Sequence, residues 1–95
     1  MTLALIIRPE AEADLAAAAA WYARIGHERR FEQRIENTLA GIVDGPLRFP
    51  VVYEDVRRAL VRRYPYAIFY VVEPDRIAVL AILHQRRDPA RWPRR

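Results

Sequence analysis

Two neighbouring segments near the C-terminus, 67–72 and 77–83, are apolar at both of the positions that alternate along a strand. Because successive side chains of a strand point to opposite faces, such runs need cover on both faces of a sheet. Only two helical segments are present elsewhere in the chain, and they suffice for one face. We therefore predict that a partner chain covers the second face. Cover by loop 45–55, the C-terminal tail and strand twist is the alternative.

The N-terminal half predicts a short strand followed by a helical hairpin. Residues 3–8 are rich in β-branched side chains and leucine, and Pro9 suits the first turn of a helix. The spacing predicts helices over 9–25 and 27–43, joined at Gly26. Their inward faces, at spacings of three and four, are Ala11, Leu15, Ala18, Ala19 and Tyr22 in the first helix and Phe31, Ile35, Leu39 and Ile42 in the second.

The remainder predicts a loop at 45–55 followed by β structure, which gives an α+β fold of order β-α-α-β-β-β. Strands are expected at 56–64, 66–73 and 76–83. Glu73-Pro74-Asp75-Arg76 suits a tight turn, so the last two strands should form a hairpin. Asp88-Pro89 predicts one short helical turn at 88–92. The 95 residues leave room for a single domain, 1–95.

Charge is divided unevenly along the chain. Residues 1–56 hold 6 Arg against 9 Asp and Glu, a net charge of −3, whereas residues 57–95 hold 10 Arg against 3 acids, a net charge of +7. The C-terminal half is therefore where an anionic partner is expected.

The candidate binding residues are arginines and aromatic residues of this basic half. Arg57-Arg58 and Arg62-Arg63 bracket one predicted strand, so one arginine of each pair should point to each face. An arginine fork pairs bidentately with phosphate or carboxylate, and tyrosine rings can stack on bases, which suits nucleic acid or an acidic peptide. A solvated strand face is the structural alternative. The candidates are Arg58, Arg62, Tyr64, Tyr66, Tyr70, Arg86, Arg87, Arg91 and Trp92.

Several kinds of chemistry have no support in the composition. The chain has no cysteine and only two histidines, so disulfides, thiol nucleophiles and a conventional transition-metal site are not expected. A phosphate loop, a nucleophile elbow and paired carboxylates are also missing, and no cofactor is predicted. The apolar run Leu3–Ile7 is too short for a signal peptide or a membrane span. We therefore expect a cytoplasmic protein that does not enter the membrane.

Two longer patterns carry a resemblance. They are Tyr-Pro-Tyr-x-Ile-x-Tyr at 64–70 and His-x-x-Arg-x-Pro-x-x-Trp at 84–92. Together with the length and the order of elements, they resemble the ParE-like, plasmid-stabilisation branch of the RelE/ParE superfamily of bacterial toxin-antitoxin toxins. The resemblance implies a helical hairpin on one face of a mostly antiparallel sheet, with the first strand beside the last long one. It also implies a cognate antitoxin that wraps the toxin with an acidic and apolar C-terminal segment.

The resemblance leaves two targets to weigh. Members similar to RelE cleave messenger RNA on the ribosome with basic residues and a C-terminal Tyr, whereas the ParE-like branch poisons DNA gyrase without known hydrolytic chemistry. This chain keeps Arg86, but has Ala67 in place of another Arg and Trp92 in place of the Tyr. Trp cannot transfer a proton as a phenol can, and Ala supplies no charge. These absences favour a non-enzymatic gyrase inhibitor and argue against direct nucleic-acid binding.

Two alternatives stay open. One is a ribosome-dependent endoribonuclease in which Arg86 acts with Arg62 or His84 in place of the missing groups. The other is an inactive relative that only binds the antitoxin.

Overall fold

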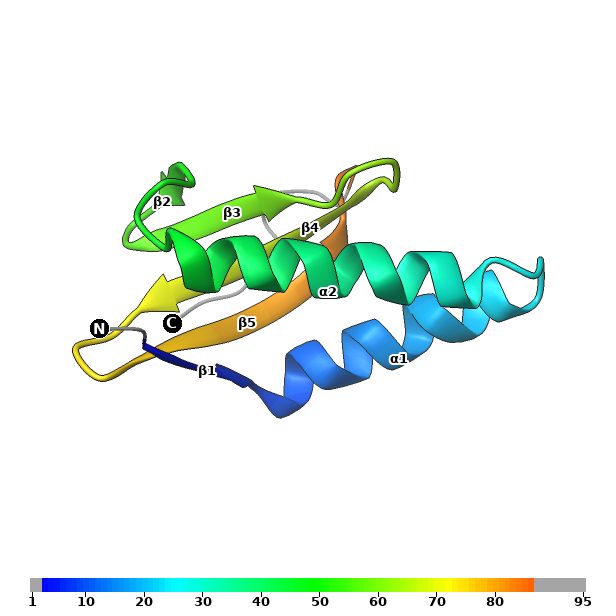
Figure 1. The fold of residues 1–95 in the computed structure, drawn as a ribbon, viewed down its shortest axis with the longest axis horizontal. Coiled ribbons are helices and arrows are strands. Elements are labelled where there is room, and N and C mark those ends of the chain that lie inside the picture. Colours follow the sequence, from blue (N-terminus) through cyan, green and yellow to red (C-terminus); the bar gives the residue numbers. More distant parts are fainter. Residues whose placement is uncertain (1–2, 87–95) are drawn as a thin grey trace.

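The computed structural model of the protein describes residues 3–86, which form two layers. One layer is a five-stranded sheet, and the other is a pair of helices on one face of it (Figure 1). The elements in chain order are β1 Ala4–Ile7, α1 Pro9–Ala23, α2 Glu28–Asp44, β2 Val51–Tyr53, β3 Val56–Leu60, β4 Tyr66–Val72 and β5 Arg76–His84. The predicted α+β class and the helical hairpin on one face are confirmed. The turn predicted at 88–92 lies outside the described residues.

The sheet has the order β1-β5-β4-β3-β2. β1 runs parallel to β5, which confirms the pairing that the resemblance implied, and the other pairs are antiparallel. Two expectations are wrong. The strand predicted at 56–64 ends at Leu60, and the loop predicted at 45–55 contains the short edge strand β2. The order is therefore β-α-α-β-β-β-β.

The helices form where the sequence predicts them because their ends are well specified. Pro9 occupies the first turn of α1, and Gly26 after its end has φ +75°, a left-handed conformation that glycine adopts at little cost. The His27 N–H donates to Tyr22 O at 2.9 Å and the Gly26 N–H to Ala23 O at 3.2 Å, which is the Schellman arrangement. This cap turns the chain directly into α2.

The predicted inward faces of both helices pack on the sheet. Ala11, Ala18, Ala19 and Tyr22 of α1 and Phe31, Ile35 and Ile42 of α2 are buried, while Leu15 and Leu39 are partly buried against them. Asp14 of α1 accepts a hydrogen bond from the Ile82 N–H of β5 at 3.1 Å, which ties the helix to the sheet.

The second face of the sheet carries an apolar cluster of its own. Leu80 is an extra residue in β5, because Phe69 pairs with Ala81 and Tyr70 with Val79, and this bulge puts Leu80 and Ala81 on the same face. The buried members are Val56, Ala67, Phe69, Val71, Ala78, Leu80, Ala81 and Leu83, with Val52 and Tyr53 packed against them. The isolated chain therefore already buries these side chains, and cover of this face by a partner chain stays a prediction.

The loop after α2 is held by hydrogen bonds from arginine and tyrosine side chains to backbone carbonyls. Arg57 Nη1 donates to Leu47 O at 3.1 Å and to Phe49 O at 2.7 Å, and the Tyr70 hydroxyl donates to Pro46 O at 2.6 Å. Arg48 folds back to donate to Gly41 O at 3.1 Å in the last turn of α2, where a cation is also favoured by the helix dipole.

Candidate functional site

The β3–β4 turn and the end of β5 meet at one end of the sheet. The Val61 N–H donates to Tyr66 O at 2.9 Å and closes the turn, and the Gln85 N–H donates to Pro65 O at 2.8 Å. Arg62 and Arg63 therefore lie in a turn and not in a strand, which corrects the predicted alternation of their side chains. The same hydrogen bonds bring Arg62, His84 and Arg86 to one end of the sheet.

His84 is oriented by a local hydrogen bond. The Arg86 N–H donates to His84 Nδ1 at 3.1 Å, so this nitrogen is an acceptor and the neutral imidazole carries its proton on Nε2. The imidazole ring centroid lies 5.5 Å from that of Tyr66, its partner across the strand pair. His84 is half-buried and Arg86 is exposed.

The three candidate tyrosines lie in different environments. Tyr70 is fully buried, and burial raises the pKa of its phenol to about 12 against the opposing effect of Arg57 and Arg48. It therefore offers no ring face to a partner. Tyr64 and Tyr66 are half-buried in an aromatic cluster with Tyr22 and Phe31.

The aromatic cluster uses its ring faces internally. Tyr22 stacks on Phe31 with ring centroids 4.6 Å apart, and Tyr64 meets both rings edge-on at 5.1 and 5.3 Å. Burial and the neighbouring Tyr66 and Tyr64 raise the pKa of Tyr22. Such pairs favour edge-to-face and offset contacts, so the rings of this cluster pack mainly on one another.

The other candidates are spread over the molecule. Arg58 pairs with Phe69 across β3 and β4 and is half-buried on the second face of the sheet. Arg57 faces the helix side and holds the loop after α2. Arg87, Arg91 and Trp92 lie outside the described residues.

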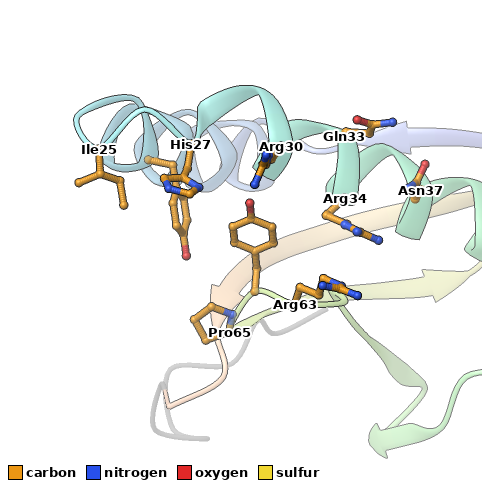
Figure 2. A pocket seen from close by; sticks show the side chains of 10 residues that line it. Ile25, His27, Arg30, Gln33, Arg34, Asn37, Arg63 and Pro65 are labelled. Atoms are coloured by element: carbon orange, nitrogen blue, oxygen red, sulfur yellow. The ribbon is translucent and has the colours of Figure 1, made fainter.

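A concave basic surface was not predicted from the sequence. A cleft of about 790 Å³ lies between the first half of α2 and the β3–β4 turn. Figure 2 shows Arg30 and Arg34 extending from α2, with Arg63 facing them from the turn. The lining is completed by Tyr22, Ile25, His27, Gln33, Asn37, Tyr64 and Pro65. We define these ten residues as the basic cleft.

The basic cleft holds positive charge without a compensating acid in its lining. Within residues 3–86, Arg30, Arg34 and Arg63 form no ion pair or side-chain hydrogen bond, whereas Arg48 pairs with Asp44 and Arg76 pairs with Glu73. Arg30 and Arg34 are one helical turn apart, a spacing at which like charges repel. Arg63 has φ +71°, a left-handed conformation that is costly for a residue with a Cβ.

Sequence reasoning missed Arg30 and Arg34 because they alternate with glutamates on α2 and resemble solvated helix positions. The spacing of Arg30, Gln33, Arg34 and Asn37 at i, i+3, i+4 and i+7 does put them on one face of the helix, and this polar stripe is the pattern that could have indicated a site. Only the fold reveals that a third arginine faces this stripe.

The described part of the chain offers no group of three or more His, Cys, Asp or Glu side chains that could hold a metal ion. Among the same residues, neither helix is both long and apolar enough to cross a membrane.

Comparisons with known proteins agree with this architecture. The family model described as "ParE toxin of type II toxin-antitoxin system, parDE" matches residues 5–89. Among solved structures, the chain is similar to the chromosomal ParDE toxin-antitoxin system from P. aeruginosa. The TM-score is 0.76 with 20% sequence identity, and the match covers 87% of this chain and 96% of that chain. At this identity the likeness concerns the fold alone. No sequence among the curated proteins matches this chain.

Proposed function

Because this chain belongs to the ParE toxin family of type II toxin-antitoxin systems, we propose that it is a toxin that inhibits DNA gyrase and is neutralised by a cognate antitoxin. The observation that carries the proposal is the family match over residues 5–89, supported by a fold of the same kind. The antitoxin supplies an acidic and apolar C-terminal segment, and both proteins act in the cytoplasm.

The environment of Ala67 supports a non-enzymatic mode of action. RelE-like nucleases place an arginine where this chain has Ala67, and here that side chain is 1% exposed within the apolar cluster of the second face. Positioned donors that stabilise a charged transition state contribute about 100-fold or more to a rate. A buried alanine supplies no such donor, so this position adds nothing to phosphodiester cleavage.

The ribonuclease alternative keeps one observation in its favour. Arg62, His84 and Arg86 lie at the same end of the sheet, with the His84 Nδ1 fixed by the Arg86 N–H. An imidazole and two arginines at one end of the sheet are residue types that suit acid–base chemistry on a phosphate. Mapping transcript ends after induction separates the two functions: cuts positioned on codons indicate the nuclease, and intact messages with DNA-damage signalling indicate gyrase inhibition.

The direct test is a supercoiling assay with purified protein and purified gyrase. We expect supercoiling to be inhibited, and we expect addition of the antitoxin to restore it. If the protein arrests growth in cells but leaves supercoiling unchanged, gyrase is not the target. If strong expression without the antitoxin leaves growth normal, the chain is an inactive relative.

The proposed binding surface consists of the candidates that reach the molecular surface or lie outside the described residues. They are Arg58, Arg62, Tyr64, Tyr66, Arg86, Arg87, Arg91 and Trp92; Tyr70 is withdrawn because it is buried. Arg62→Glu, in the exposed turn, should weaken antitoxin binding or toxicity. A change below the roughly 1 kcal/mol typical of exposed ion pairs would make this turn ordinary solvated surface.

A further inference from the structure

We propose that the basic cleft is a docking site for an acidic protein segment whose carboxylates lie one helical turn apart, in contact with Arg30, Arg34 and Arg63. The inference rests on the proposed function, in which the cognate antitoxin supplies that segment. It places one antitoxin contact at the N-terminal half of α2 and the β3–β4 turn.

The charges of the basic cleft are arranged for an external anion. Arg30 and Arg34 repel each other along α2, and Arg63 faces them across the cleft, yet none of the three has an acidic partner within residues 3–86. A carboxylate bound between them would relieve this repulsion and accept charge-assisted hydrogen bonds. Arg34 is half-buried, so its pairing would be screened less than that of a fully exposed arginine.

The spacing of Arg30 and Arg34 indicates how the acids of the ligand are spaced. Four residues of helix rise about 6 Å, so the Cα atoms of Arg30 and Arg34 are about that far apart. Two acids at positions i and i+4 of a partner helix have the same spacing. Gln33 and Asn37 lie on the same stripe and add amide donors that suit carboxylate or backbone oxygens.

The rest of the lining favours a protein segment over nucleic acid. Tyr22 and Tyr64 use their rings in the aromatic cluster, so they offer no free platform on which a base could stack. Ile25 is 53% exposed at the edge of the cleft and suits an apolar side chain of an amphipathic segment. A phosphate backbone would leave that side chain in water.

The acids of α2 lie away from the basic cleft. Helix α2 carries four acids and three arginines, a net charge of −1, and two of those arginines line the cleft. Glu28, Glu32 and Glu36 do not line the cleft, because at 3.6 residues per turn they lie on the side of the helix away from the stripe of Arg30 and Arg34, so they leave the charge of the cleft uncompensated.

The experiment measures the affinity of the antitoxin encoded in the adjacent reading frame for charge-reversal variants of the full chain. We expect Arg34→Glu to weaken binding by about 10- to 100-fold, with Arg30→Glu and Arg63→Glu in the same range. Arg29→Glu is the matched control, because Arg29 is an exposed arginine of α2 outside the cleft, and it should change affinity by less than about 3-fold. Thermal melts verify that each variant is folded.

Each outcome decides the question. If the wild-type chain binds the antitoxin and the cleft variants bind as tightly as Arg29→Glu, the inference is overturned while the proposed function stands. If the wild-type chain does not bind the antitoxin, the neutralisation and the inference both fall. A fluorescent single-stranded 20-mer whose binding depends on Arg34, with antitoxin binding unchanged in Arg34→Glu, would assign the cleft to nucleic acid and overturn the proposal. A Glu→Arg change in the acidic segment that restores affinity for Arg34→Glu would confirm the contact.

Discussion

The two ends of α2 both gather arginines, and they use them differently. At the C-terminal end, Arg48 and Arg57 donate to the backbone carbonyls of Gly41, Leu47 and Phe49. At the N-terminal end, the arginines of the basic cleft have no acidic partner in the part of the chain that the structure describes. The position of an arginine in the sequence therefore does not reveal its role. Its role depends on whether its N–H groups already donate to acceptors within the chain, as in the loop after α2, or are left for a partner, as in the basic cleft.

The difference is also one of stability. At the C-terminal end, loss of Arg57 would remove the donor to the partly buried Phe49 O, which costs about 1 to 3 kcal/mol. At the N-terminal end, the charges repel and one backbone conformation is strained, so their removal should cost little or even stabilise the fold. Four substitutions test this contrast, beginning with the aromatic cluster.

Phe31→Ala should have the largest effect, because Phe31 is fully buried and stacks on Tyr22 beneath the basic cleft. Removal of a buried aromatic ring costs about 3 to 5 kcal/mol, a large part of the stability of a domain of this size. Urea denaturation measures the loss. A loss below about 1 kcal/mol would mean that the aromatic cluster does not support the cleft.

Arg57→Met should lower the free energy of unfolding by about 2 kcal/mol, because one guanidinium nitrogen donates to two carbonyls of the loop after α2. Arg29→Met is the matched control and should lie within about 0.5 kcal/mol of the wild-type chain. Equal stability of the two variants would remove the distinction between the two ends of α2. Methionine preserves much of the side-chain length, so the comparison isolates the hydrogen bonds.

Tyr70→Phe should lower the free energy of unfolding by about 1 kcal/mol, because it removes the hydroxyl that donates to Pro46 O. The wild-type chain should also become less stable at high pH. Burial raises the folded-state pKa of Tyr70 to about 12 from 10.0. Its contribution is therefore complete below pH 10 and is lost as the pH rises through 12. Denaturation curves between pH 9 and 12 measure this slope. A slope as steep in Tyr70→Phe would assign it to another group, of which Tyr22 is the first candidate.

The sequence predicted most of the fold because the signals involved are local. The stripes of α1 and α2, the turn at Gly26 and the apolar runs of β4 and β5 all express spacing and turn chemistry within a short window. The predicted strand at 56–64 failed because residues 61–65 turn back without a glycine, and Arg63 adopts the left-handed conformation instead. Strand β2 was missed because three residues between prolines and acids carry almost no pattern.

The candidate site was harder to predict because its residues meet through long-range contacts. The burial of Tyr70 depends on Pro46, which is 24 residues away in the chain. The basic cleft depends on α2 meeting the β3–β4 turn. Arg30 and Arg34 gave no basic signal in the sequence, because glutamates lie between them and the net charge of a segment does not distinguish the faces of a helix. The apolar second face was identified correctly, and Val52 and Tyr53, which belong to the segment 45–55 named as an alternative cover, pack against its cluster.

Arg63→Gly should have the smallest effect on stability, and in the opposite direction to the other three. Glycine adopts φ +71° without the cost that a Cβ brings, so relief of strain and of repulsion should offset the greater flexibility of the unfolded chain. We expect a gain of about 0.5 to 1 kcal/mol in the free energy of unfolding, together with weaker antitoxin binding. Arg63→Asn, which tolerates the same conformation and also removes the charge, is the control for glycine's flexibility. A gain in stability with unchanged binding would show that the strain serves no partner. A loss of stability would show that Arg63 stabilises the turn itself. The arginines at the N-terminal end of α2 would then have a structural role like that of Arg48 and Arg57 at its C-terminal end.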